Sequence, residues 1–108
     1  MAKKSKSAFS IPEIKAFWAS KSVKRSKGKN DRLEKNAGGV TYYLFGNAIA
    51  HYDPGTHTLK LSDANYQSVT TKDRLNDLGA NINLKDFIWY TVINRKVVRW
   101  PGSKKIRV

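Results

Sequence analysis

Residues 40–62 read VTYYLFGNAIAHYDPGTHTLKLS, in which three segments rich in strand-forming residues alternate with two turn signals. Aromatic and β-branched residues fill the first segment, and Gly46-Asn47 after it predicts a two-residue hairpin turn with Gly first. Asp53-Pro54-Gly55-Thr56 predicts a second turn, because Pro fixes φ and Gly accepts a positive φ. The alternation of apolar and polar residues over 58–62 is typical of a half-buried strand. The stretch therefore predicts a three-stranded antiparallel meander with strands at 40–45, 48–52 and 58–62.

The C-terminal part of the chain predicts a further hairpin and a basic tail. Strand formers fill residues 87–93 and 96–100, and Asn94-Arg95 between them is a turn signal. Pro101-Gly102 is expected to end the sheet, because Pro cannot donate a hydrogen bond to a ladder. Residues 103–108 are then expected to form a basic tail.

Two helices are predicted, one before and one after the meander in the sequence. Ser10 and Glu13 form a capping box for the first, over Ser10–Ser20. Thr70 or Thr71 is expected to cap the second. Apolar residues recur at helical spacing in both, at Ile11, Ile14, Phe17 and Trp18 and at Val69, Leu75 and Leu78. We expect the first apolar face to dock on the core; the alternative is that it docks in a partner's groove.

The remaining N-terminal segments are polar and basic. Met1–Phe9 is expected to be a basic arm, and Lys21–Lys35 a flexible cationic loop, because Val23 and Leu33 are its only apolar residues. The fold class is therefore α+β, with a small antiparallel sheet, made of the meander and the C-terminal hairpin, and two short helices. The expected organisation is a basic arm, helix and loop over 1–36, an α+β domain over 37–102 and a basic tail over 103–108.

Composition limits the environment of the protein. The 108 residues include no cysteine, so the sequence offers neither a disulfide framework nor a thiolate metal site. The basic start is not followed by an apolar run of signal-peptide length, and no stretch approaches the roughly 18 apolar residues of a membrane-spanning helix. We therefore expect a soluble cytoplasmic protein without a membrane partner.

The net charge of +13 is unevenly distributed along the chain. Residues 1–36 carry a net charge of +8, residues 37–93 carry −1, and residues 94–108 carry +6. Clusters of cations bind polyanions through counterion release, whatever the sequence of the polyanion. DNA or RNA is the partner that this layout favours, while another acidic partner or a role in solubility alone remains open.

Signals for catalysis are weak. His51, Asp53 and His57 fall close together and could bind a metal, but the sequence supplies no convincing fourth ligand. There is no nucleophile elbow, no Gly-rich phosphate loop and no pair of carboxylates for two-metal hydrolysis. We therefore expect no enzymatic activity, cofactor, metal or small-molecule substrate.

Signals for binding are stronger. The start of the second helix, Thr70 to Arg74, could hold a phosphate oxygen at its free N–H groups, or could be an ordinary capped start with Lys72 and Arg74 in solvent. Trp100 could stack on a base, although packing in the core is favoured, and either Tyr42 or Tyr43 must face away from the core. The residues expected to bind nucleic acid are Lys21, Lys24, Arg25, Lys27, Lys29, Arg32, Thr70, Thr71, Lys72, Arg74, Arg95, Lys96, Arg99, Lys104, Lys105 and Arg107.

Parts of the sequence resemble a family of small bacteriophage domains. The resemblance lies in residues 44–50, 58–66 and 69–76 and in Trp89-Tyr90, and Thr-Thr-Lys followed by Arg-Leu-Asn is its most specific part. It covers about Val40 to Trp100. It implies a phage origin and a host-cytoplasm setting, and it supplies no catalytic residue to transfer.

Three functions follow as hypotheses. The leading one is a nucleic-acid-binding phage protein that contacts mainly phosphates, with little sequence preference. The rival is a phage-encoded inhibitor or modulator that binds a host or defence protein through an acidic patch on that protein. The third is a structural component packaged with the genome. The sequence leaves open whether DNA or RNA is bound, whether it is single- or double-stranded, and what the oligomeric state is.

Overall fold

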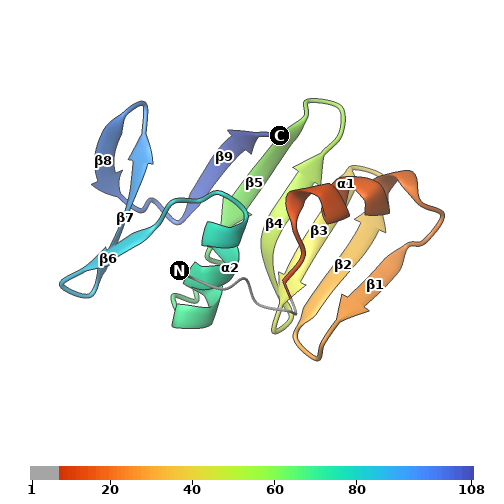
Figure 1. Ribbon diagram of the computed structural model, residues 1–108, viewed down its shortest axis with the longest axis horizontal. Coiled ribbons are helices and arrows are strands. Elements are labelled where there is room, and N and C mark those ends of the chain that lie inside the picture. Colours follow the sequence, from red (N-terminus) through yellow and green to blue (C-terminus); the bar gives the residue numbers. More distant parts are fainter. Residues whose placement is uncertain (1–7) are drawn as a thin grey trace.

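The computed structural model describes residues 8–108 and contains two antiparallel sheets and two helices (Figure 1). The α+β class is confirmed, while the sheet is larger than the predicted meander and hairpin. The elements in chain order are α1 (Ile11–Ala19), β1 (Lys24–Lys27), β2 (Asp31–Asn36), β3 (Gly39–Leu44), β4 (Asn47–Asp53), β5 (Thr58–Ser62), α2 (Val69–Asp77), β6 (Asn83–Lys85), β7 (Ile88–Ile93), β8 (Lys96–Arg99) and β9 (Ser103–Arg107).

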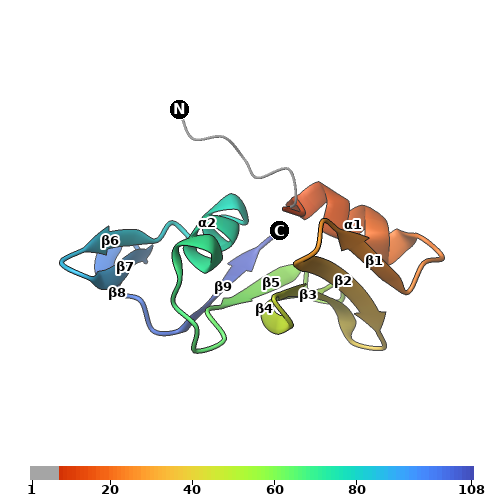
Figure 2. The same ribbon diagram turned by 90° about the horizontal axis from the view of Figure 1, so that it is seen from below.

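The large sheet has six strands in the order β1-β2-β3-β4-β5-β9, and the small sheet has three in the order β6-β7-β8. Both helices lie on the same face of the large sheet, and its opposite face is uncovered (Figure 2). The small sheet lies beyond α2 at one end of the molecule (Figure 1), whose longest dimension is 44 Å.

The predicted meander is present as β3, β4 and β5. Its first turn is displaced by one residue, because Leu44 pairs with Asn47 and leaves Phe45-Gly46 as the two-residue loop. Phe45 and Gly46 have φ of 53° and 80°, so both turn residues adopt the left-handed conformation, not the Gly-first turn that was predicted. The third strand, 58–62, has the predicted bounds.

The prediction of a flexible loop over Lys21–Lys35 is wrong, because most of this segment forms β1 and β2. Leu33 is fully buried opposite Tyr42, and Asp31 is buried opposite Leu44. A single apolar residue therefore suffices to anchor β2, since β3 supplies the other half of the contact. Polar composition concealed this strand, because a buried Asp looks like a loop residue in the sequence.

The prediction of a basic tail over 103–108 is also wrong for most of its length. Residues Ser103–Arg107 form β9, which pairs with all five residues of β5. Ile106 lies opposite Leu59, and its side chain packs on the core. Pro101-Gly102 therefore ends the small sheet and leads the chain back to the edge of the large one.

The predicted C-terminal hairpin is confirmed as β7 and β8, with Asn94 and Arg95 at its turn. The structure adds β6, which pairs with β7 and which the sequence did not indicate. Trp100 is buried, as favoured, and its indole Nε1 donates to Asp63 Oδ2 at 3.0 Å. The base-stacking alternative for Trp100 is excluded by this burial.

The first helix is confirmed, including its capping box. Ser10 Oγ accepts from the backbone N–H of Glu13, and Glu13 accepts in return from the backbone N–H of Ser10. Ile14 and Phe17 are buried in the core, so the apolar face docks on the protein's own sheet.

The second helix is confirmed with a different cap. Ser68, not Thr70 or Thr71, is the N-cap, and its Oγ accepts from the backbone N–H of Thr71 at 3.1 Å. Leu75 and Leu78 are fully buried as predicted, but Val69 is 70% exposed. The cap lies two to three residues earlier than expected, which places Val69 in the first turn, away from the sheet.

Strand alternation separates the two adjacent tyrosines as predicted. Tyr42 is 1% exposed on the face that the helices cover, whereas Tyr43 is half-buried on the uncovered face. Within residues 8–108, no helix has the length and apolar character needed to cross a membrane.

Candidate nucleic-acid interface

Arg74, one of the predicted phosphate ligands, forms an internal ion pair. Its Nε donates to Asp31 Oδ2 at 2.7 Å and its Nη2 donates to Oδ1 at 3.2 Å. Tyr42 Oη donates to the same carboxylate, and burial followed by this hydrogen bond raises the pKa of Tyr42. Arg74 is 8% exposed, so the alternative in which its side chain faces solvent is wrong. This two-point pairing holds α2 against β2.

Lys104 is also engaged within the fold. Its Nζ donates to the carbonyl oxygens of Ala80 and Val92, at 3.1 and 2.9 Å, and to Thr91 Oγ1 at 3.2 Å. A lysine ammonium has three donors, and these contacts use all of them. Lys104 therefore joins β9 to the small sheet.

Two further predicted ligands are paired near β1 and β2. Lys27 donates to Glu13 Oε2 at 2.7 Å, and although burial raises the pKa of Glu13, this contact and those with Ser10 hold it below its usual value. Arg32 Nε lies 2.5 Å from Glu34 Oε2, and the guanidinium lies 4.6 Å from the centre of the Tyr43 ring. Both cations are half-buried, with part of their charge already compensated.

Of the two predicted hydroxyl ligands, Thr71 is buried and Thr70 is half-buried at the start of α2. Thr71 Oγ1 accepts from Ser68 Oγ at 3.0 Å, so its hydroxyl belongs to the cap. Lys72 is half-buried beside them. The helix start therefore presents fewer polar groups than the sequence suggested.

The other nine predicted cations are exposed and have no partner within the described residues. They lie in two groups: around β1 on one side of the large sheet, and in the β7–β8 turn, β8 and β9 on the other (Figure 1). They are Lys21, Lys24, Arg25 and Lys29 in the first group and Arg95, Lys96, Arg99, Lys105 and Arg107 in the second. We call these nine residues the cationic rim.

The strand register places Lys105 beside Lys60 on the uncovered face of the large sheet. The same cross-strand row continues through His51, Thr41 and Glu34 and ends at Lys24 in β1. Lys60 was not among the predicted ligands, because its place beside Lys105 depends on the pairing of β5 with β9.

The two histidines do not form a metal centre. Within residues 8–108 there is no group of three or more metal-ligating side chains. His51 Nδ1 lies 3.0 Å from Thr41 Oγ1 and its Nε2 lies 3.3 Å from the carbonyl oxygen of Gly38. Asp53 accepts from the backbone N–H of Gly55, and this contact lowers its pKa. His51 and Asp53 thus serve strand and turn structure.

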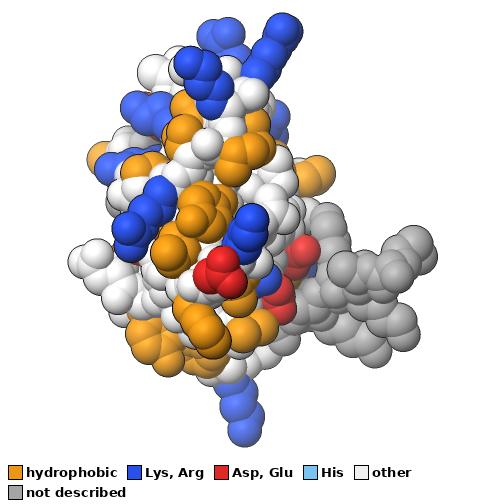
Figure 3. Space-filling view, turned by 90° about the vertical axis from the view of Figure 1, so that its left-hand side faces the viewer, with side chains coloured by type: hydrophobic (Ala, Val, Ile, Leu, Met, Phe, Trp, Pro, Cys, Tyr) orange, Lys and Arg blue, Asp and Glu red, His pale blue; other side chains and the backbone are white. Residues whose placement is uncertain are grey.

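Exposed apolar side chains gather at the end of the molecule that carries the small sheet. Figure 3 looks onto this end and shows hydrophobic side chains with Lys and Arg between them. The exposed fractions reach 70% for Val69 and 97% for Phe87. We define the apolar patch as Val69, Leu84 and Phe87, which line the same pocket. The sequence did not predict this patch, because Phe87 falls at the start of the strand-forming run over residues 87–93.

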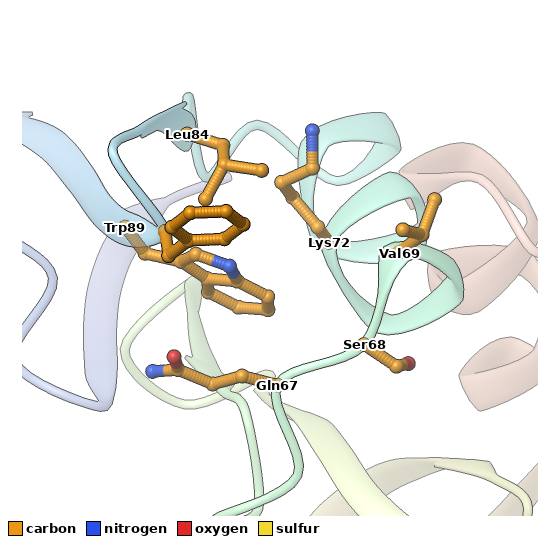
Figure 4. Close-up of a pocket in the computed structure, with 7 residues that line it drawn as sticks. Gln67, Ser68, Val69, Lys72, Leu84 and Trp89 are labelled. Carbon is orange, nitrogen blue, oxygen red and sulfur yellow. The ribbon is translucent and has the colours of Figure 1, made fainter.

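A pocket of about 210 Å³ lies between the start of α2 and the β6–β7 hairpin (Figure 4). Trp89 forms one wall, and Leu84 and Lys72 lie at its upper side in this view. Gln67 lies below the indole ring. The residues that line the pocket are Gln67, Ser68, Val69, Lys72, Leu84, Phe87 and Trp89. Only Lys72 among them was predicted as a ligand.

Comparisons with known proteins identify a family. No similar curated protein and no similar solved structure was found. One family model matches, described as Kyanoviridae Gp96 protein, and it covers residues 11–104. The match includes α1, β1 and β2, which lie outside the resemblance seen in the sequence, and confirms its phage assignment. The chain therefore belongs to the Kyanoviridae Gp96 protein family of bacteriophages.

Proposed function

We propose that this protein binds the phosphate backbone of nucleic acid through its cationic rim, with little sequence preference and without catalysis. The observation that carries the proposal is the different placement of acidic and basic side chains. The fold uses most carboxylates internally and leaves nine of the predicted cations exposed.

The carboxylates are engaged in several ways. Glu13, Asp31 and Glu34 form ion pairs with Lys27, Arg74 and Arg32. In addition, Asp63 is buried and accepts from Trp100, and Asp53 accepts from backbone N–H groups in its turn. Asp73 and Asp86 are the exposed acidic residues of the described chain. The exposed charged side chains of the described residues are therefore mostly basic.

Such a surface favours phosphates over other anions, because a nucleic acid presents a regular series of charges and releases a counterion for each one neutralised. The rim lies on both sides of the large sheet in a molecule 44 Å long. At one charge per roughly 1.7 Å of duplex axis, a ligand of that length offers many more charges than the rim can contact. Contacts with phosphates carry no sequence information, which is why we expect little preference.

The test is a salt titration of binding to labelled DNA and RNA, both single- and double-stranded. The variant is Lys24→Gln, Arg25→Gln, Lys105→Gln and Arg107→Gln together. The log–log slope of affinity against salt should become shallower by about 0.9 units per lost phosphate contact on duplex DNA, or about 0.7 on single strands.

The matched control exchanges charge type at the same four positions, with Lys24→Arg, Arg25→Lys, Lys105→Arg and Arg107→Lys. This control should keep the wild-type slope, because phosphate neutralisation depends mainly on charge. A wild-type protein that binds none of the four ligands at low salt would end the proposal.

A second function is favoured by the apolar patch, which is typical of a protein–protein contact site. In this alternative the protein modulates a host or defence protein through the patch and neighbouring cations. A pull-down from nuclease-treated host lysate separates the two functions. A stoichiometric protein partner that is retained by the wild type and lost in Phe87→Ala would favour the alternative.

A further inference from the structure

Trp89 carries a hydrogen-bond donor that the fold does not satisfy. Its side chain is 6% exposed, and its indole N–H has no acceptor among the described residues. The indole nitrogen lies on the side of the ring that faces α2 and the pocket (Figure 4). Trp100, the other buried tryptophan, donates to Asp63 at 3.0 Å. Because the indole nitrogen keeps contact with solvent, its N–H is open to the pocket and can donate to a ligand acceptor.

Phe87 lines the same pocket with an exposed side chain and a strained backbone conformation. It is 97% exposed and has a φ of 65°, in a turn position where Gly or Asn is ordinarily found. Exposure and a left-handed backbone both cost free energy, and neither helps the fold. An aromatic ring kept in solvent at such a cost is expected where the ring contacts a ligand.

The polar groups of the pocket complement a nucleotide. Lys72 supplies a cation. Gln67 Nε2 donates to Asp63 at 3.0 Å, which holds the side chain in place and leaves its Oε1 as an acceptor. The pocket thus combines aromatic and aliphatic walls with one donor, one acceptor and one cation. Its volume of about 210 Å³ is below the roughly 300–1,000 Å³ of pockets for drug-sized ligands, so it suits one planar group.

We propose that this pocket takes one unpaired base of a single-stranded nucleic acid, with an adjoining phosphate at Lys72. The base stacks on the aromatic wall and accepts from the Trp89 indole N–H. This inference rests on the proposed function and adds the strand type to it. A base in a duplex cannot enter, because its faces are already covered by its neighbours.

The test compares single-stranded oligonucleotides with a duplex of the same length at fixed salt, using Phe87→Ala and Trp89→Phe. Loss of one base–aromatic stack, about 1–3 kcal/mol, corresponds to roughly 5- to 150-fold weaker single-strand binding by Phe87→Ala. Duplex binding should be unchanged. Trp89→Phe keeps a ring and removes the donor, so it should weaken single-strand binding without abolishing it.

The matched control is Phe45→Ala, which removes another exposed turn phenylalanine, 48% exposed, between β3 and β4. It should bind single strands like the wild type. Equal binding of single strands by Phe87→Ala and the wild type would overturn the inference while leaving the salt-dependent backbone binding intact. A wild type that binds no nucleic acid would overturn both. A Phe87→Ala variant that loses only a protein partner would also overturn it.

Discussion

One buried carboxylate organises the centre of the molecule at the scale of single residues. The Asp31 side chain is inaccessible to solvent and accepts from Arg74 and Tyr42, which belong to α2 and β3. Removing one member of a buried pair leaves the other charge without compensation, which costs far more than a surface pair is worth. The contact therefore decides whether α2 stays on the sheet.

Asp31→Ala should lower the free energy of unfolding by about 3–5 kcal/mol, because the Arg74 guanidinium remains buried without its partner. Asp73→Ala, at an exposed position of α2 next to Arg74, is the control and should change stability by less than about 0.5 kcal/mol. Urea unfolding followed by circular dichroism measures both. Similar values for the two variants would contradict the role given to Asp31.

Tyr42 should make the protein sensitive to alkali. Burial and the contact with Asp31 raise its pKa in the folded state, so the folded chain keeps a proton that the unfolded chain loses above about pH 10. Stability should therefore fall as pH rises past that value, since the unfolded state then binds fewer protons. Urea unfolding between neutral pH and pH 11 should show a steeper decline in wild type than in Tyr42→Phe. Parallel declines would refute this assignment.

At the scale of elements, strand order explains where the basic residues lie in the sequence. β1 and β9 are the two edges of the large sheet and β8 is an edge of the small one. Their sequences are KRSK, SKKIR and KVVR. Of the inner strands, β3, β4 and β7 contain no Lys or Arg, β5 contains Lys60, and β2 balances its two cations with two carboxylates. Lysine on an edge strand opposes pairing with another chain. The charged ends of the sequence are thus also the edges of the sheets.

Two variants of β1 should separate edge protection from phosphate binding. Lys24→Thr with Arg25→Thr removes charge and adds strand propensity, so it should weaken nucleic-acid binding and increase self-association. Lys24→Glu with Arg25→Glu should weaken binding at least as much without added association, because charge still guards the edge. Light scattering and a binding titration measure the two effects. Undiminished binding in both variants would assign β1 to edge protection alone.

The elements that the sequence predicted are those with local signals. The meander and the β7–β8 hairpin have turn residues within a few positions of each strand, and α1 carries its own capping box. β2 and β9 could not be predicted, because each depends on a partner brought close by the fold: Asp31 on Arg74, and Ile106 on Leu59. For the site, the sequence showed which segments are basic, but it could not show which of their cations form ion pairs within the fold. The pocket needed both α2 and the small sheet in place.

At the scale of the whole molecule, β9 closes the fold. The chain leaves the large sheet after β5, forms α2 and the small sheet, and returns to pair with β5 (Figure 1). Val108 at its end donates its backbone N–H to the carbonyl oxygen of His57, and Lys15 of α1 donates to Val108. The last residues thus connect the helix layer to the sheet.

A chain that stops after Gly102 should be less stable by about 3 kcal/mol or more, at roughly 1 kcal/mol for each ladder hydrogen bond lost. Full-length Lys105→Gln with Arg107→Gln is the control, since it removes charge and keeps the strand. It should unfold like the wild type in urea while binding nucleic acid more weakly. Wild-type stability in the shortened chain would show that β9 contributes nothing to the fold.

The three hydrogen bonds of Lys104 have a consequence for the reach of the molecule. They fasten β9 to the small sheet, so the proposed base pocket beside that sheet and the basic edge at β9 are held together. A single-stranded nucleic acid that is long enough to contact both sites binds more tightly, because once bound at one site it has a high effective concentration at the other. A shorter fragment engages one or the other and forfeits that gain. Affinity should consequently rise in a step, at the length where a strand first spans them.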